Sequence, residues 1–240
     1  MANPRSIVLL LRDEAWVFRR VVYKALFERR LKGDAVDEFT RVYYDGHLLG
    51  DTRADTHWLG VRTDKCPLDL WIYQELIARL RPDVIVETGT LDGGSALYLA
   101  SICDLVGHGE VVTIDLEAPP APPEHPRITY VRGSSVDEAV VAEVRARTAG
   151  KSALVVLDSD HRRDHVLAEL HAYADVVPVG GYLIVEDTIL NGHPINPEFG
   201  PGPMEAVEAF LAEDRRFEVD RRCEKLYMTF NRRGYLRRVR

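Results

Sequence analysis

The 240-residue sequence predicts an α/β fold, in which helices cover both faces of a doubly wound, mostly parallel sheet. Two patterns predict this class. From about residue 67, short apolar runs typical of buried strands alternate with stretches at helical spacing. The first of these strands leads into a glycine-rich turn, the place where such sheets bind ligands. A third pattern, two apolar runs near the C-terminus, adds an antiparallel hairpin at the edge of the sheet.

Each element of the sheet has its own local signal. A helix over 68–80 follows Pro67 and ends before Arg81-Pro82. Beyond it we expect strands at 84–87, 111–115, 128–131, 153–157 and 182–185, with helices at 95–105, 136–149 and 163–173. A helix at 204–211 then precedes the two hairpin strands, Phe217 to Asp220 and Tyr227 to Phe230.

The sequence predicts that residues 1–66 form an N-terminal extension, either helical or a cap, and that residues 67–240 form the main domain. Apolar side chains recur at helical spacing between residues 5 and 32, and an aromatic cluster follows at Tyr43, Tyr44 and Trp58. These aromatics either line a pocket for the substrate or pack the extension against the domain. Because the first helix is both apolar and basic, we expect a homodimer.

Composition excludes several classes of protein. The formal net charge of −7 argues against a nucleic-acid partner, although the first helix and the C-terminal tail are locally basic. Those segments are either solvated or contact another subunit, or they dock to an anionic partner or a membrane surface. No run approaches the roughly 20 apolar residues of a membrane span. Three scattered cysteines, without zinc spacing, are expected to be reduced thiols of a cytoplasmic protein.

The glycine-rich turn, Glu87 to Ser95, predicts a nucleoside cofactor without phosphate. Three residues separate Gly89 from Gly93, so the turn does not match the GxGxxG motif that admits a pyrophosphate. Asp115, at the end of the next strand, is placed to bind ribose hydroxyls. The acidic Glu87 suits a cationic cofactor. S-adenosylmethionine, a sulfonium without phosphate, satisfies both requirements.

Two neighbouring strand ends carry acidic residues and predict a metal site. Asp158 and Asp160 follow one strand, and Glu186 and Asp187 follow the next. Carboxylate oxygens suit Mg²⁺, and buried acidic groups need a compensating charge. His161 is a candidate general base for a metal-bound hydroxyl. The alternatives are that His161 is a capping or surface residue, and that Asp160 caps the following helix. Which of Asp158 and Asp160 binds the metal stays open.

Four motifs together resemble the cephalosporin hydroxylase / rhamnosyl O-methyltransferase family. They are Lys65 to Trp71, Val86 to Thr90, Leu157 to His161 and Val185 to Thr188, and the likeness extends from about Trp58 to Tyr227. More distantly, the core is similar to catechol O-methyltransferase. The resemblance implies the Rossmann-like class I methyltransferase fold, with metal ligands at Asp158, Glu186 and Asp187 and His161 in place of a catalytic lysine. It places the following residues around S-adenosylmethionine: Lys65, Glu87, Gly89, Thr90, Ser95, Asp115, Ser135 and Asp158.

The expected activity is therefore S-adenosylmethionine- and Mg²⁺-dependent methylation of a hydroxyl on a sugar, an oligosaccharide or a glycosylated small molecule. An antibiotic or phenolic intermediate is the alternative acceptor. An oxidoreductase is a rival class, but GxGxxG is missing and a non-haem iron site needs two histidines with one carboxylate. A non-catalytic scaffold is a further rival. The loop containing His193 is either a lid over the substrate or an ordinary connection.

Overall fold

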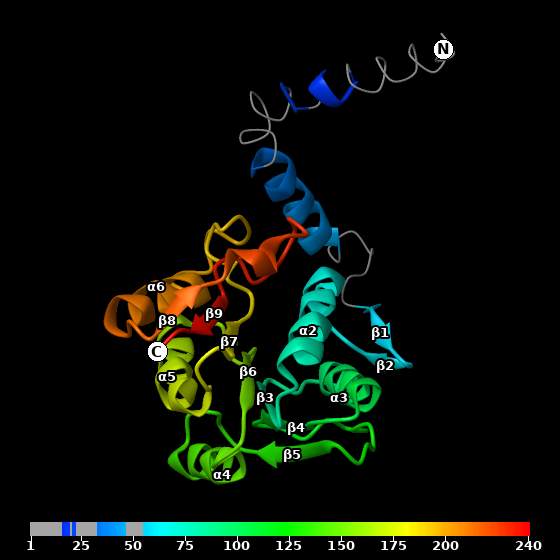
Figure 1. The fold of residues 1–240 in the computed structure, drawn as a ribbon, viewed down its shortest axis with the longest axis vertical. Coiled ribbons are helices and arrows are strands. Elements are labelled where there is room, and N and C mark those ends of the chain that lie inside the picture. Colours follow the sequence, from blue (N-terminus) through cyan, green and yellow to red (C-terminus); the bar gives the residue numbers. More distant parts are fainter. Residues whose placement is uncertain (1–15, 20, 23–32, 47–54) are drawn as a thin grey trace, which may run out of the picture.

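The computed structural model describes residues 16–19, 21–22, 33–46 and 55–240 (Figure 1). Within these residues the main sheet has seven strands in the order β5-β4-β3-β6-β7-β9-β8. The five parallel strands are β5 (Ile128–Arg132), β4 (Glu110–Asp115), β3 (Val84–Thr88), β6 (Ala153–Leu157) and β7 (Tyr182–Val185). β9 (Tyr235–Arg238) pairs antiparallel with both β7 and the edge strand β8 (Phe217–Val219).

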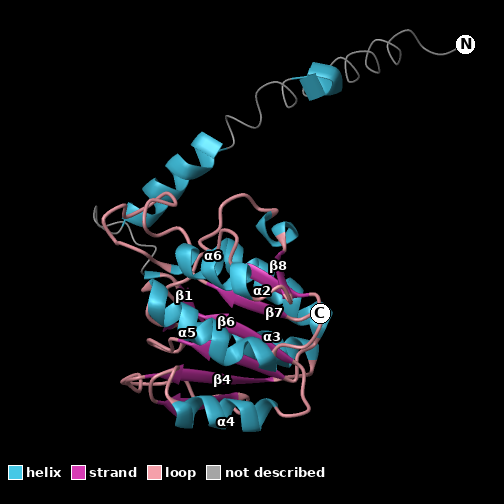
Figure 2. Cartoon of the chain, turned by 90° about the vertical axis from the view of Figure 1, so that its left-hand side faces the viewer, coloured by secondary structure: helices cyan, strands magenta, loops and turns pink. Residues whose placement is uncertain are grey.

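Helices cover both faces of this sheet (Figure 2). On one face lie α2 (Pro67–Leu80) and α3 (Gly94–Val106), and on the other α4 (Glu138–Thr148), α5 (Arg163–Tyr173) and α6 (Pro203–Glu213). Strand β3 shows why the sequence builds two layers. Its Val84 and Val86 belong to the apolar cluster of α4, α5 and α6, whereas Ile85 between them belongs to the cluster of α2 and α3. The predicted doubly wound fold is confirmed.

The point where strand order reverses lies between β3 and β6. β3 pairs with β4 on one side and with β6 on the other, so the loops after β3 and β6 leave the sheet side by side. Gly89, directly after β3, has φ of +87°, and a Cβ there would overlap the carbonyl oxygen of Asp158. Glycine at this position therefore lets the two loops touch, and it shapes the place where a ligand is expected.

The predicted second strand of the C-terminal hairpin is wrong. Residues 227–230 form an irregular segment, and the strand that joins the sheet is β9, which lies further along the chain. The apolar character of Met228 and Phe230 has another cause, because both pack in a separate cluster with Ile189, Leu190 and Ile195. Asp69 fixes the backbone of this segment by accepting the amide of Phe230 (2.8 Å).

The N-terminal residues agree only in part with expectation. Residues 16–19 and 21–22 are helical, and the rest of the predicted helix over 5–32 lies outside the described residues. A helix over 33–45 and a two-stranded hairpin, β1 (His57–Trp58) and β2 (Val61–Arg62), were not predicted. Two short 3₁₀ turns are η3 (Ala174–Val176) and η4 (Arg221–Glu224).

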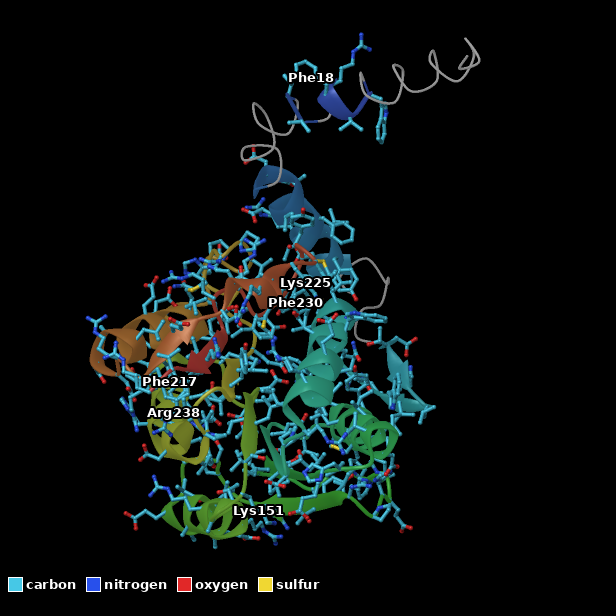
Figure 3. All side chains as sticks on the ribbon, in the orientation of Figure 1. Phe18, Lys151, Phe217, Lys225, Phe230 and Arg238 are labelled. Carbon is cyan, nitrogen blue, oxygen red and sulfur yellow. The ribbon has the colours of Figure 1, made fainter. Side chains whose placement is uncertain are left out.

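The helix over 33–45 rests on the C-terminal segment. Arg232 pairs with Asp37 (2.6 Å), and Tyr43 and Tyr44 each meet the ring of Phe230 edge-on; Figure 3 labels Phe230 at this junction. The three cysteines are buried free thiols, as expected. Within the described ranges, no helix combines the length and the apolar character that a membrane crossing requires.

Candidate functional site

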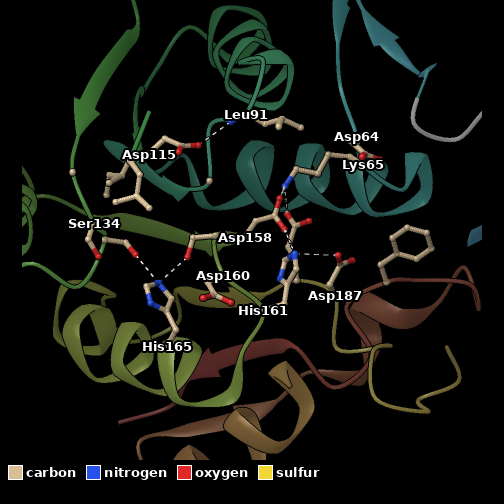
Figure 4. Close-up of a pocket in the computed structure, with 18 of the residues that line it drawn as sticks. Asp64, Lys65, Leu91, Asp115, Ser134, Asp158, Asp160, His161, His165 and Asp187 are labelled. Atoms are coloured by element: carbon tan, nitrogen blue, oxygen red, sulfur yellow. Dashed lines mark hydrogen bonds and ion pairs between the residues drawn. The ribbon is translucent and has the colours of Figure 1, made fainter. Parts of the chain in front are cut away.

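A cavity of about 650 Å³ opens at the carboxyl ends of the parallel strands (Figure 4). Residues that follow β3, β4, β5, β6 and β7 all contribute to its wall. The predicted site residues that line it are Lys65, Gly89, Asp115, Ser135, Asp158, Asp160, His161, Glu186 and Asp187. Glu87, Thr90 and Ser95 do not line it; all three are buried.

One end of the cavity carries an acidic cluster. Single donor atoms of Asp158, His161 and Asp187 all lie within 4.8 Å of one another, which is close enough to share one metal ion. Because β6 and β7 are neighbouring parallel strands, the residues that follow them meet here, as the sequence predicted. Asp187 has φ of +52°, an uncommon conformation that an aspartate tolerates better than most residues.

Asp160 stands apart from that cluster. Its Oδ1 accepts the backbone amide of Arg162 (2.9 Å), immediately before α5, and its side chain is exposed. It lines the cavity but contributes no atom to the group of potential metal ligands among the described residues. Asp160 is not the N-cap of α5 either, since that position is Arg162; its carboxylate closes a local turn just before the helix.

Lys65 provides the positive charge within the acidic cluster. Its Nζ donates to Oδ2 of Asp158 and to Oε1 of Glu186, the latter at 2.8 Å. Burial by itself would lower the pKa of Lys65, but Coulombic attraction to Asp158 and Glu186 outweighs it and raises the pKa. Burial also raises the pKa of both carboxyl groups, and Lys65 offsets part of that effect. The sequence indicated Lys65 as a site residue but not these partners.

His161 faces the same carboxylates. Its Nε2 lies 3.4 Å from Oδ2 of Asp187 and 3.9 Å from Oδ1 of Asp158. Burial would lower the pKa of His161, whereas the negative charges of Asp187, Asp158 and Glu186 raise it, and the net shift is upward. The imidazole of His161 thus lies close to the carboxylates of Asp187 and Asp158 and also lines the cavity.

Glu186 is fixed by a buried network that sequence reasoning missed. The Tyr73 hydroxyl donates to Oε1 of Glu186 (2.7 Å), and Nδ2 of Asn231 donates to the Tyr73 oxygen (2.8 Å). Tyr73 and Asn231 come from α2 and from the C-terminal segment, so two distant parts of the chain hold one carboxylate. Its Oε1 already has two donors, Lys65 and Tyr73. No motif in the sequence marks this pairing.

The other end of the cavity is shaped around Asp115. Its Oδ2 accepts the amides of Thr90 (2.8 Å) and Leu91 (3.1 Å), so it braces the glycine-rich turn. Beneath the turn, Thr113 donates to Oε2 of the fully buried Glu87 (2.7 Å). Burial raises the pKa of Glu87. Sequence reasoning also missed Ser159 and His165, which line this end of the cavity.

Two aromatic side chains complete the wall. Tyr44 and Phe230 line the cavity, whereas Trp58 packs edge-on against Tyr98 at a ring distance of 4.8 Å. The aromatic cluster predicted from the sequence therefore divides: Tyr44 reaches the cavity, and Trp58 packs against the domain.

Comparison with known proteins identifies the family. A sequence model of the rhamnosyl O-methyltransferase/CmcI family matches residues 51–239. The rhamnosyl O-methyltransferase of Mycobacterium tuberculosis is 38% identical over 187 residues, covering 75% of both chains. That of Mycobacterium leprae is 35% identical over 212 residues, covering 85% of this chain and 90% of its own.

Solved structures show the same fold. An apo structure of CmcI has a TM-score of 0.62 and 23% identity, and the match covers 79% of this chain and 78% of CmcI. A structure of CmcI with Mg and SAM gives the same TM-score and covers 78% of each chain. The extent of the family match and the identity to the mycobacterial relatives agree with the motifs. The chain belongs to the rhamnosyl O-methyltransferase/CmcI family of S-adenosylmethionine-dependent O-methyltransferases.

Proposed function

We propose that this protein transfers a methyl group from S-adenosylmethionine to a hydroxyl of a sugar or a glycosylated small molecule, with Mg²⁺ bound at the acidic cluster. The observation that carries the proposal is the meeting of Asp158, His161 and Asp187 in the same cavity as the Gly89 turn and Asp115. The mycobacterial relatives are named for a rhamnosyl acceptor, and one CmcI structure is described as holding Mg and SAM.

The residues present fit the metal. Asp158 and Asp187 offer carboxylate oxygens, the ligands that Mg²⁺ prefers, and Glu186 lies next to them with Oε1 already held by Lys65 and Tyr73. We assign Asp158, Asp187 and Glu186 to the metal and leave Asp160 out, because its carboxylate accepts the backbone amide of Arg162 and contributes no atom to the group of potential ligands. When bound, S-adenosylmethionine supplies the methyl group and Mg²⁺ polarises the acceptor hydroxyl.

We assign His161 as the general base, not as a ligand. An imidazole nitrogen is a poor ligand for Mg²⁺ compared with the neighbouring carboxylates. As the acceptor oxygen forms its bond to the methyl carbon, Nε2 of His161 takes the hydroxyl proton, and the bond from sulfur to that carbon breaks. Burial by itself would lower the pKa of His161, but the charges of Asp187 and Asp158 raise it. A cation bound to the same carboxylates would counter their effect and favour the unprotonated imidazole that a base requires.

Two features favour a sugar as the acceptor: the adjacent hydroxyls of the sugar itself and the aromatic side chains in the wall of the cavity. Two adjacent hydroxyls of a sugar can bind one metal ion together. Tyr44 and Phe230 supply apolar surface for the ring carbons next to the acidic cluster. A catechol also offers two adjacent oxygens, so a phenolic acceptor is the second candidate.

The test uses the full chain with S-adenosylmethionine and three acceptors: methyl rhamnoside, phenyl rhamnoside and catechol. We expect methylated rhamnoside and S-adenosylhomocysteine by mass spectrometry, loss of product with EDTA and recovery with added Mg²⁺. Equal product with EDTA would remove the metal from the proposal. Methylation of catechol alone would replace the sugar with a phenol.

We also infer a homodimer formed through the first helix. Trp16, Val17, Phe18 and Val21 are all more than half exposed, which is unusual for large apolar side chains on one short helical stretch (Figure 3 labels Phe18). Light scattering should give twice the chain mass for the wild type and the chain mass for Phe18→Glu. A monomeric wild type would refute the dimer.

A further inference from the structure

A carboxylate outside the cavity is held by three donors from the C-terminal part of the chain. Asp69, in the first turn of α2, is buried and does not line the cavity. Its Oδ1 accepts the hydroxyls of Thr229 and Tyr235, the latter at 2.7 Å. Its Oδ2 accepts the backbone amide of Phe230 (2.8 Å). Burial raises the pKa of Asp69 to about 6 although these hydrogen bonds lower it, so the group is ionised at neutral pH and can only accept.

Stability alone does not explain this carboxylate. An ionised carboxyl group costs folding free energy when it is buried, and the three donors to Asp69 are neutral groups. Among the described residues, no cation offsets its charge. What Asp69 provides is a fixed conformation for the segment that donates to it.

Asp69 fixes three consecutive residues, 229–231. The Thr229 hydroxyl gives its proton to Asp69, so its oxygen is left to accept the amide of Asn231 (2.9 Å). Asp69 accepts the amide of Phe230 directly. The segment is neither helix nor strand, so these hydrogen bonds determine its path. Phe230 is thereby held in the wall of the cavity beside Tyr44.

The side chain of Asn231 extends this order toward the acidic cluster. Its Nδ2 donates to the hydroxyl oxygen of Tyr73 (2.8 Å) and lies 3.5 Å from that of Tyr235. Tyr235 gives its own proton to Asp69, and Tyr73 gives its own to Oε1 of Glu186 (2.7 Å). Both hydroxyl oxygens can therefore only accept from Asn231. This fixes its amide with Nδ2 toward them, although Oδ1 is left buried without a hydrogen-bond partner among the described residues.

The two oxygens of Glu186 are thus not equivalent. Oε1 accepts from Tyr73 and from Nζ of Lys65 (2.8 Å). Oε2 accepts no hydrogen bond within the described ranges, and Glu186 lines the cavity. Oε2 is therefore the oxygen left for a metal ion.

We propose that Asp69 positions both parts of the acceptor site. It places the ring of Phe230 in the cavity wall. Through Asn231 and Tyr73 it also orients Glu186, so that Oε2 stays available to the metal ion. This inference rests on the proposed function, which assigns Glu186 to Mg²⁺ and Phe230 to the acceptor. Asp69, Tyr73 and Asn231 do not line the cavity, so each is a positioning residue that acts through a residue that does.

Tyr73→Phe tests the contact with Glu186, because it removes one hydroxyl and leaves the ring in place. We expect about tenfold weaker binding of Mg²⁺ in calorimetry with S-adenosylhomocysteine present, the lower range for a lost partner of a metal ligand. The affinity for S-adenosylhomocysteine should not change. Tyr182→Phe is the matched control, because Tyr182 is similarly buried and its hydroxyl donates to Asp220, outside the cavity. Unchanged Mg²⁺ affinity in Tyr73→Phe, or an equal loss in Tyr182→Phe, would overturn the proposal.

Thr229→Val tests both effects of Asp69, since it keeps the shape of the side chain but removes the hydroxyl between Asp69 and the amide of Asn231. We expect about tenfold weaker Mg²⁺ binding. At saturating Mg²⁺, KM for the methylated rhamnoside should rise roughly three- to tenfold, the range for one lost hydrogen bond. Thr229→Ser, which keeps the hydroxyl, should restore both values. Tyr235→Phe, which removes another donor to Asp69, takes its place if Thr229→Val does not fold.

A purely structural role would not give this pattern, because loss of fold weakens S-adenosylhomocysteine as much as Mg²⁺. A wild type that binds no Mg²⁺, or that methylates no rhamnoside, would refute the proposed function itself. A wild type that does both, with variants that match it in Mg²⁺ affinity and in KM, would refute only the positioning role of Asp69.

Discussion

Asp187 is the residue that separates the metal hypothesis from the cofactor hypothesis most cleanly. It belongs to the group of potential ligands, and its φ of +52° is a conformation that asparagine also tolerates. Asp187→Asn therefore removes the negative charge without adding backbone strain. We expect Mg²⁺ affinity to fall at least tenfold in calorimetry, while affinity for S-adenosylhomocysteine stays within about twofold.

Asp164→Asn is the matched control, because Asp164 is an exposed residue at the start of α5 that pairs with Arg163. It should bind both ligands as the wild type does. Unchanged Mg²⁺ binding in Asp187→Asn would show that the acidic cluster is not the metal site.

His161 is tested by rate and not by binding. His161→Ala should lower the turnover number roughly 100-fold or more, the lower range for a lost general base, and leave the affinity for S-adenosylhomocysteine nearly unchanged. Stopped assays at saturating cofactor and acceptor measure this. A wild-type rate in the variant would move the role of base to another residue.

Asp115 both holds the glycine-rich turn and is the residue assigned to the ribose of the cofactor. Asp115→Ala removes the acceptor of the Thr90 and Leu91 amides together with the proposed ribose contact, so we expect at least tenfold weaker binding of S-adenosylhomocysteine. Calorimetry measures it, with thermal unfolding as the check that the domain still folds. An unchanged affinity would refute the ribose assignment.

At the scale of elements, the loop between β7 and α6 is tied down by one carboxylate. Glu205 accepts from Nε2 of His193 (2.9 Å), from Nδ2 of Asn191 (2.9 Å) and from the amide of Gly202 (2.7 Å). Burial by itself would raise the pKa of Glu205, but these hydrogen bonds lower it to about 2. The loop is thus joined to the first turn of α6.

This contact predicts a definite pH dependence. Because the pKa of Glu205 is depressed in the folded state, its stabilisation is fully present above about pH 4.5 and is lost as the pH falls toward 2. Glu205→Gln should lower the free energy of unfolding by about 2 kcal/mol at pH 7 and by much less at pH 3. Urea unfolding at both pH values measures this. An equal loss of unfolding free energy at both pH values would contradict the lowered pKa of Glu205. The control is Glu208→Gln, because Glu208 forms an exposed ion pair with Arg233.

The parallel strands could be predicted from the sequence, whereas the second strand of the C-terminal hairpin could not. The five parallel strands were predicted within about a residue. The central strands β3, β6 and β7 are buried on both faces and therefore read as continuous apolar runs, whereas β5 is only partly buried. The strand predicted at 227–230 is wrong because Met228 and Phe230 are apolar in order to pack against Ile189 and Leu190, not to pair in the sheet. The spacing of apolar residues in a short segment does not distinguish packing of an irregular segment from pairing of a strand.

For the whole molecule, the sequence located the site but not the contacts inside it. Parallel strands bring their carboxyl ends to one edge, so Asp158, Glu186 and Asp187 had to meet there. Lys65 and Tyr73, which bond to Glu186 directly, lie 121 and 113 residues from it in the chain. Asn231 bonds to Tyr73, and nothing local in the sequence indicates any of these pairings. The division into an extension over 1–66 and a domain over 67–240 stays a prediction, although Lys65 already serves the domain's site.

Binding of both S-adenosylmethionine and Mg²⁺ in one cavity is tested most directly by calorimetric titration of the EDTA-treated full chain, first with S-adenosylmethionine and then with Mg²⁺. We expect one cofactor site per chain, followed by one Mg²⁺ site whose affinity falls at least tenfold in Asp187→Asn. Folded protein that binds no S-adenosylmethionine would refute both the cofactor site and the proposed methyl transfer.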